Sequence, residues 1–101
     1  MKYKKAWKRL VEEARTLGLK VKLVGNSTLH DYAAMNPEAA KVMGFPDTTY
    51  ILIDRNLPMR SRCESLDHEL EEYRRMRFHG EPYWPAHLYA LKNEKDLVWS
   101  R

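Results

Sequence analysis

Apolar residues recur every three or four positions in three parts of the chain, which is the spacing of helices with one buried side. These segments are residues 3–17, 60–78 and 83–95. Gly18 is a natural stop for the first of them. Gly80 and Pro82 separate the other two, because glycine favours a helix C-terminal cap and proline cannot continue the helix. The last two helices are therefore expected to form a hairpin.

Two further segments have the pattern of β-strands. Residues 19–24 alternate apolar and basic side chains, as in a strand with one buried face, and residues 48–54 are rich in β-branched and aromatic side chains. The signal between these strands is weaker. Asn36-Pro37 is typical of a helix start, which predicts a short helix over residues 37–43.

Together these elements predict a small α+β domain that occupies residues 1–101 as a single unit. Its short β-sheet would pack with an N-terminal helix, a motif-bearing helix and a following C-terminal helix. A chain of 101 residues has room for one modest core. Hydrophobic residues make up 44% and charged residues 32%, proportions that are typical of globular rather than disordered proteins.

Composition also bears on location and partners. The apolar runs are only a few residues long and the N-terminus has no signal-peptide pattern, so no membrane span is expected. Cys63 is the lone cysteine and cannot form an internal disulfide, which fits a reducing compartment. We therefore expect a cytoplasmic protein without a membrane partner. The net charge of +4 leaves nucleic acid as an alternative partner, although the basic residues are spread out as on solvated helix faces.

One short motif points to chemistry. Residues 68–72, His-Glu-Leu-Glu-Glu, differ by one letter from the H-E-x-x-H helix of zinc metallopeptidases. In that pattern the first residue and the last, one helical turn apart, bind the metal, and the glutamate after the first histidine is a general base. His68 and Glu72 would then be ligands and Glu69 the base. The competing interpretation is a solvated helix face, because a histidine followed by acids is common on helices.

A catalytic zinc site needs a third protein ligand. His87 is the first choice, because it lies 15 residues after Glu72 on the next helix and can reach the motif once the hairpin closes. Glu94 is the alternative, as a ligand or as an acceptor that orients a ligand. His79 follows the motif helix directly and would have to fold back sharply, and His30 is expected in a turn or on the surface.

The helix over residues 83–95 has two distinct sides. An apolar stripe contains Trp84, Leu88 and Leu91. The other side could fold back over the motif helix and contains His87, Ala90, Leu91 and Glu94.

Several neighbouring side chains have simpler interpretations than chemistry. The aromatic residues Tyr83, Trp84 and Tyr89 are expected in the core rather than as substrate contacts. Asp67 is expected at the helix surface or as an acceptor that orients a histidine, and Cys63 as a small buried hydrophobe. Tyr83, Tyr89 and an arginine from the 74–77 segment stay open as donors to a developing oxyanion.

The order of these features resembles a known family. A strand over residues 49–54, a short polar turn, and a helix that carries the His-Glu pair are similar to the strand, turn and active helix of small zincin-like metallopeptidases of the ImmA/IrrE type. The resemblance covers residues 45–95, about half the chain. It implies a zinc-dependent hydrolase fold with His68 as a ligand and Glu69 as the base. The chain departs from the family at Glu72, where the family has histidine, and His87 would then complete a His-Glu-His ligand set.

We therefore expect a metal-dependent hydrolase that acts on a peptide or protein substrate. Zinc is the expected cofactor, and the carboxylate-rich motif also suits a harder divalent metal such as manganese. A homodimer or another partner could complete the substrate cleft of so small a chain. The alternatives are a non-catalytic zincin-like binding or regulatory module and a small basic protein associated with nucleic acid.

Overall fold

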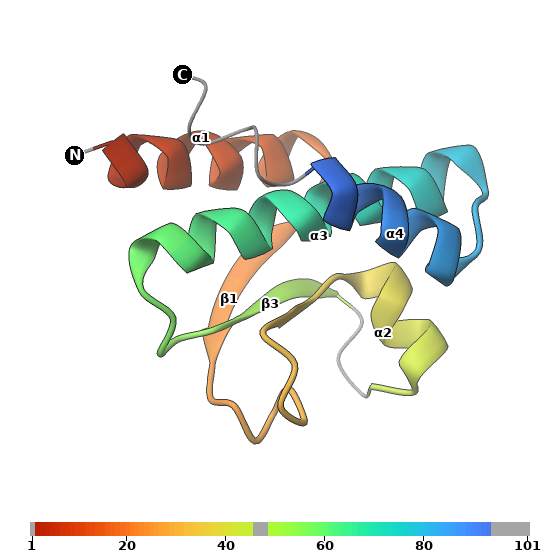
Figure 1. Cartoon of the computed structure of the whole chain (residues 1–101), viewed down its shortest axis with the longest axis horizontal. Helices are drawn as coiled ribbons and strands as arrows, with labels where there is room; N and C mark the ends of the chain where they lie inside the picture. Colours follow the sequence, from red (N-terminus) through yellow and green to blue (C-terminus); the bar gives the residue numbers. More distant parts are fainter. Residues whose placement is uncertain (1, 46–48, 94–101) are drawn as a thin grey trace.

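The computed structural model describes residues 2–45 and 49–93 (Figure 1). Within these ranges the chain forms four helices and a three-stranded sheet. The elements are α1 (Lys2–Thr16), β1 (Lys20–Val24), β2 (Ala34–Met35), α2 (Pro37–Met43), β3 (Tyr50–Asp54), α3 (Met59–His79) and α4 (Tyr83–Asn93). The protein is thus a small α+β fold, as the sequence predicts. No helix in the described part of the chain is both long and apolar enough to cross a membrane.

The sheet has β3 at its centre, between β1 and β2. β1 runs parallel to β3 with Val21 opposite Ile51, and β2 runs antiparallel to it with Ala34 opposite Ile53. Both faces of β3 are covered, because Ile51 and Ile53 pack into one cluster of buried side chains and Leu52 into another. A strand covered on both faces needs apolar residues on both, which explains the continuous apolar run in this part of the sequence.

The helices form a layer on each face of the sheet (Figure 1). α1 and α3 pack against the face that carries Ile51 and Ile53, while α2 packs against the face of Leu52. The predicted stripe of α3 is entirely buried and consists of Cys63, Leu66, Leu70 and Tyr73. This stripe anchors the motif helix on the sheet and leaves its neighbouring side for other contacts.

The segment before α2 contains the strand that the sequence did not predict. β2 has only two residues, so it cannot show the alternation by which strands are recognised. The loop before it contains His30, which is exposed and adopts φ 49°, in agreement with the expected turn. Asn36 follows β2 and caps α2, since its side chain accepts a hydrogen bond from the Ala39 N–H.

The most apolar side of α4 faces solvent, and a different side packs against the protein. Trp84 and Leu88 are 64% and 59% exposed, and Tyr89 is also exposed, so the expectation that Trp84 and Tyr89 belong to the core is wrong. Tyr83 is buried as expected, together with the small residues Ala86 and Ala90. Small side chains let two helices approach closely, which explains why the alanine side rather than the bulky side faces the protein. Residues 94 and 95 of the predicted helix lie outside the described residues.

Two leucine-to-alanine substitutions, one in the core and one on the surface, should have different effects on the free energy of unfolding. Leu66→Ala removes a side chain with no exposed area and should lower the free energy of unfolding by about 2–5 kcal/mol, because it leaves a cavity between α3 and the sheet. Leu88→Ala, the matched exposed control, should change it by less than about 0.5 kcal/mol. Urea unfolding followed by circular dichroism measures both, and equal losses would contradict this packing.

Candidate metal centre

His68 and Glu72 project from the same side of α3, one turn apart. Both are buried next to the stripe that holds this helix on the sheet. The His68 Nε2 atom lies 3.0 Å from the Glu72 Oε2 atom. The helix geometry predicted from the motif therefore places the two side chains in direct contact inside the protein.

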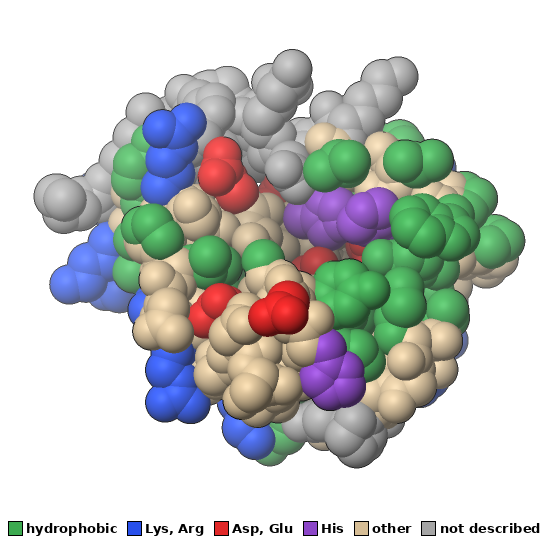
Figure 2. Space-filling view, turned by 60° about the horizontal axis from the view of Figure 1, so that its bottom comes forward, with side chains coloured by type: hydrophobic (Ala, Val, Ile, Leu, Met, Phe, Trp, Pro, Cys, Tyr) green, Lys and Arg blue, Asp and Glu red, His purple; other side chains and the backbone are tan. Residues whose placement is uncertain are grey.

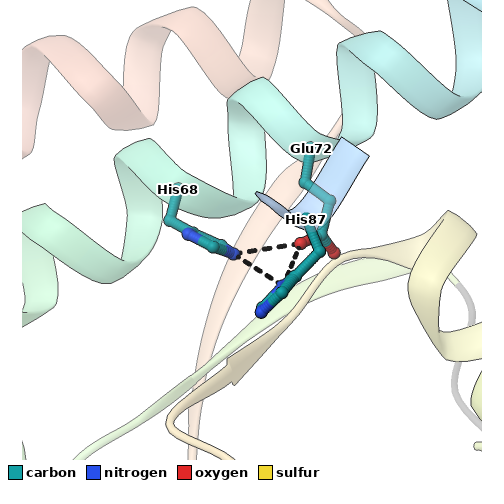
Figure 3. Close-up of side chains that lie close together, drawn as sticks. All are labelled: His68, Glu72 and His87. Atoms are coloured by element: carbon teal, nitrogen blue, oxygen red, sulfur yellow. Dashed lines mark hydrogen bonds and ion pairs between the residues drawn. The ribbon is translucent and has the colours of Figure 1, made fainter. Parts of the chain in front are cut away.

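His87 reaches the pair from α4. Gly80 ends α3 in a left-handed conformation with φ 67°, and its N–H donates to the Arg75 carbonyl oxygen, which allows the chain to reverse. His87 Nδ1 then lies 2.7 Å from Glu72 Oε2 and 3.1 Å from His68 Nε2 (Figure 3). The His87 side chain keeps 27% of its surface exposed, so the cluster is open to solvent on that side.

These three side chains form a cluster that could hold a metal ion. Their ligand atoms all lie within 4.8 Å of one another, and Figure 3 shows them converging on one point between α3 and α4. Two imidazole nitrogens and one carboxylate oxygen are a donor set of catalytic zinc sites, which leave a fourth position for water or substrate. When both ring nitrogens present a lone pair beside the carboxylate oxygen, the three atoms match the nitrogen and oxygen ligands that zinc prefers, so the donor chemistry fits a metal.

Glu69 lies beside the cluster and is also buried, with 6% of its surface exposed. Burial and the negative charge of Glu72 raise the pKa of the Glu69 carboxyl to about 8, although His68 and a hydrogen bond from Asn36 act in the opposite direction. The Asn36 Nδ2 atom donates to Glu69 Oε1 at 2.9 Å and to Glu72 Oε1 at 3.0 Å. One amide therefore bridges the two carboxylates.

A cavity of about 380 Å³ opens in front of these groups. Its lining comes from the segment around β2, from the first half of α3 and from α4, and consists of Tyr32, Ala33, Ala34, Leu57, Ser61, Glu64, Ser65, His68, Glu69, His87 and Leu91. In Figure 2 histidine and acidic side chains meet in a hollow that hydrophobic side chains border. Two residues of the cluster and Glu69 thus face a space that a small ligand or a peptide segment could enter.

The structure brings neither His79 nor His30 to this place. His79 is exposed at the end of α3 and is not part of the described metal-binding cluster. His30 is exposed in its turn, where its ring packs beside Phe45 with centroids 4.9 Å apart. Glu94 lies outside the described residues. Among the ligand candidates that the structure describes, His87 alone joins His68 and Glu72.

Neighbouring side chains correct or extend the sequence interpretation. Asp67 is buried with 5% of its surface exposed, so the expectation of a helix-surface position is wrong. Cys63 is buried as predicted, its thiol donates to the Tyr3 carbonyl oxygen at 3.2 Å, and burial raises its pKa. The Tyr83 hydroxyl lies 3.4 Å from His87 Nδ1, and burial raises the pKa of Tyr83 to about 12.

The arginines beside the motif have acidic partners on the surface. Arg74 pairs with Glu13 at 3.0 Å, and Arg75 pairs with Glu81 at 2.7 Å while its guanidinium lies 3.8 Å from the centre of the Tyr89 ring. Neither arginine is among the residues that line the described cavity. Both arginine side chains are half-buried and paired with acids, so they do not form the fully solvated face expected from the sequence.

Asn36 is the site residue that sequence reasoning missed. The Asn36-Pro37 pair predicts a helix start, and this explains why the side-chain oxygen of Asn36 accepts a hydrogen bond from the Ala39 N–H. The two contacts of its nitrogen cross 33 and 36 positions of sequence, and no local pattern signals contacts of that kind.

The raised pKa of Glu69 predicts how stability depends on pH in the metal-free protein. Between about pH 4.5 and 8 the folded protein keeps a proton on Glu69 that the unfolded chain releases, so stability falls as pH rises through this range. The Glu69→Gln variant should not show this loss. As pH rises, its free energy of unfolding should therefore increase relative to that of the parent protein by up to about 1.4 kcal/mol per pH unit. Urea unfolding with a chelator across this range measures the difference, and parallel profiles would contradict it.

Comparisons of the chain with protein-family models, with curated proteins and with solved structures found no match.

Proposed function

We propose that the protein is a minimal zinc-dependent hydrolase of the zincin type that cleaves peptide bonds. His68, Glu72 and His87 would hold the metal, and Glu69 would be the general base. The observation that carries this proposal is the convergence of three ligand atoms within 4.8 Å at a cavity that Glu69 also lines. Zinc in this place would supply Lewis acidity, which polarises a carbonyl and lowers the pKa of water.

Glu69 suits the role of a base that both accepts and returns a proton. Without a cation its pKa of about 8 keeps the carboxyl protonated at neutral pH. A positive charge beside Glu72 would lower that pKa and release the carboxylate, since a nearby opposite charge favours the ionised form. The binding of the cation would thus both complete the site and make the Glu69 carboxylate available as a base.

Of the donors left open by the sequence, Tyr83 has its hydroxyl beside a proposed ligand, although it is not among the residues that line the described cavity. Its hydroxyl lies 3.4 Å from His87 Nδ1 and stays protonated, because burial raises its pKa to about 12. A protonated hydroxyl fixed near the ligands can donate a hydrogen bond that strengthens as charge develops. Tyr89 and Arg75, which stack on each other, and Arg74, which pairs with Glu13, are engaged elsewhere.

The peptide substrate rests on the resemblance to zincin-like metallopeptidases and on the shape of the cavity. Its wall includes Ala34 of β2, an edge strand, and its floor includes the first half of α3. An edge strand has backbone groups that an extended peptide could pair with. The metal is assigned as zinc from the two imidazoles, although the carboxylate ligand also suits manganese.

A second candidate function is a partner-binding module without catalysis. Trp84, Leu88 and Leu91 are exposed together on α4, and Leu91 also lines the cavity. Exposed apolar side chains next to a cavity are typical of protein contact sites. A protein that binds zinc but hydrolyses no peptide would favour this candidate.

Metal binding provides the first test of the proposal. Purified protein loaded with zinc should contain one metal ion per chain, and His68→Ala and His87→Ala should each lower the affinity at least about 10-fold, because each removes a ligand. His79→Ala changes an exposed histidine and is the matched control, expected to bind zinc as the parent does. Elemental analysis and titration with a chromogenic chelator measure these affinities. A parent protein that binds no zinc after reconstitution would rule the proposal out.

Glutamine substitutions separate catalysis from metal binding. Glu69→Gln should keep zinc and lower peptide hydrolysis by about 10²–10⁴-fold, since it removes the base but no ligand. Glu71→Gln is the control on the same helix, where Glu71 lies 3.8 Å from Arg74, and it should keep parental rates. The assay is cleavage of a panel of quenched fluorescent peptides by zinc-loaded protein. Equal rates for parent and Glu69→Gln would exclude Glu69 as the base.

A further inference from the structure

Asn36 has an unusual position for a helix cap. It has no exposed surface, and it lies between the end of β2 and the start of α2. The Oδ1 atom accepts from the Ala39 N–H at 2.9 Å, while Nδ2 donates at 2.9 Å to Glu69 and at 3.0 Å to Glu72. The oxygen and both N–H groups of the amide are therefore used, the oxygen for α2 and the two N–H groups for the carboxyl groups of α3.

The capping bond decides which way the amide faces. An asparagine side chain can present oxygen or nitrogen to a neighbour by turning through half a circle. Here the backbone N–H of Ala39 needs an acceptor, so the oxygen must face α2 and both N–H groups must face α3. The start of α2 thus holds two donors in a fixed direction.

The two oxygens of Glu72 have separate partners as a result. Oε1 accepts from Asn36 at 3.0 Å. Oε2 lies 3.0 Å from His68 Nε2 and 2.7 Å from His87 Nδ1. Oε1 is thus held toward Asn36, and Oε2 is the oxygen that faces the two histidines and any cation between them.

We propose that Asn36 is the positioning residue of this site, which fixes Glu72 as a one-oxygen ligand and ties the Glu69 carboxyl to it. This inference rests on the proposed metal site and adds the residue that sets its geometry. Asn36 is fully buried and is not among the residues that line the described cavity, so it acts through the two carboxylates and not by touching substrate.

The neutral side chain of Asn36 suits a site that contains two acidic groups. Two adjacent buried carboxyl groups need donors for their oxygens, because water is excluded from them, and they repel each other once both are ionised. A lysine or arginine in place of Asn36 would supply donors together with a positive charge that competes with a metal. An aspartate would add a third carboxylate. The neutral amide supplies two donors without changing the charge of the site.

The test compares Asn36→Ser with a matched asparagine control. Serine keeps the helix cap but is too short to reach both carboxylates, so capping and positioning are separated. We expect the zinc dissociation constant to rise about 10–100-fold, as is usual when a group that orients a ligand is removed. Asn56→Ser changes an exposed asparagine in the turn after β3 and should leave the constant unchanged.

A cobalt spectrum distinguishes positioning from a general loss of stability. Cobalt(II) in the site of Asn36→Ser should show shifted visible absorption bands, because Glu72 can then turn and bind through both oxygens. A merely loosened protein would bind less cobalt with the same bands. Circular dichroism of the metal-free variant checks that it is folded.

Each result bears on one conclusion. If the parent binds zinc and a folded Asn36→Ser variant binds it within about 2-fold with an unchanged cobalt spectrum, the positioning role is overturned while the metal site stands. If the parent binds no zinc, the metal site falls and this inference with it. Should the variant fail to fold, a crystal structure of the zinc-loaded parent decides. One Glu72 oxygen on zinc and the other on Asn36 would support the inference, and both oxygens on zinc would overturn it.

Discussion

Glu69 and Glu72 are two carboxylates buried side by side on α3, and this constraint explains most of what surrounds them. Buried charge is costly unless it is hydrogen-bonded or paired. Three partners surround them: Asn36 comes from the start of α2, His68 from α3 itself and His87 from α4. A core built for stability alone would have placed apolar residues here, so the buried acids fit the possible metal-binding cluster better than a purely structural role.

The scaffold holds these groups on regular elements rather than loops. The buried stripe of α3 packs against β3, whose two faces are both covered, and this fixes the direction in which His68 and Glu72 project. α4 then needs only a short connection and a side of small residues to bring His87 within 2.7 Å of Glu72. Sites on helices are held more tightly than sites on loops, which matters for a cluster whose atoms must meet within tenths of an ångström.

The sequence predicted best where a pattern repeats. The stripe of α3 spans several turns, and the spacing of His68 and Glu72 follows from the helix period, so both could be found without coordinates. The apolar stripe of α4 led to the wrong prediction that Trp84 is buried. Trp84 is large, and its burial would have kept α4 away from α3. β2 is too short for any period, and the contacts of Asn36 depend on tertiary packing alone. Sequence periodicity thus located the candidate ligands on α3 but not Asn36, which contacts Glu72.

The small residues on the buried side of α4 affect how firmly this helix is held in the fold. Ala86 and Ala90 bury little apolar area, so hydrophobic packing holds this last helix less firmly than the leucine-rich stripe holds α3. Much of its attachment then comes from Tyr83 and from the polar contact between His87 and Glu72. Packing of α4 onto α3 and assembly of the candidate ligand set would then occur together. A cation bound between α3 and α4 would stabilise the folded position of α4.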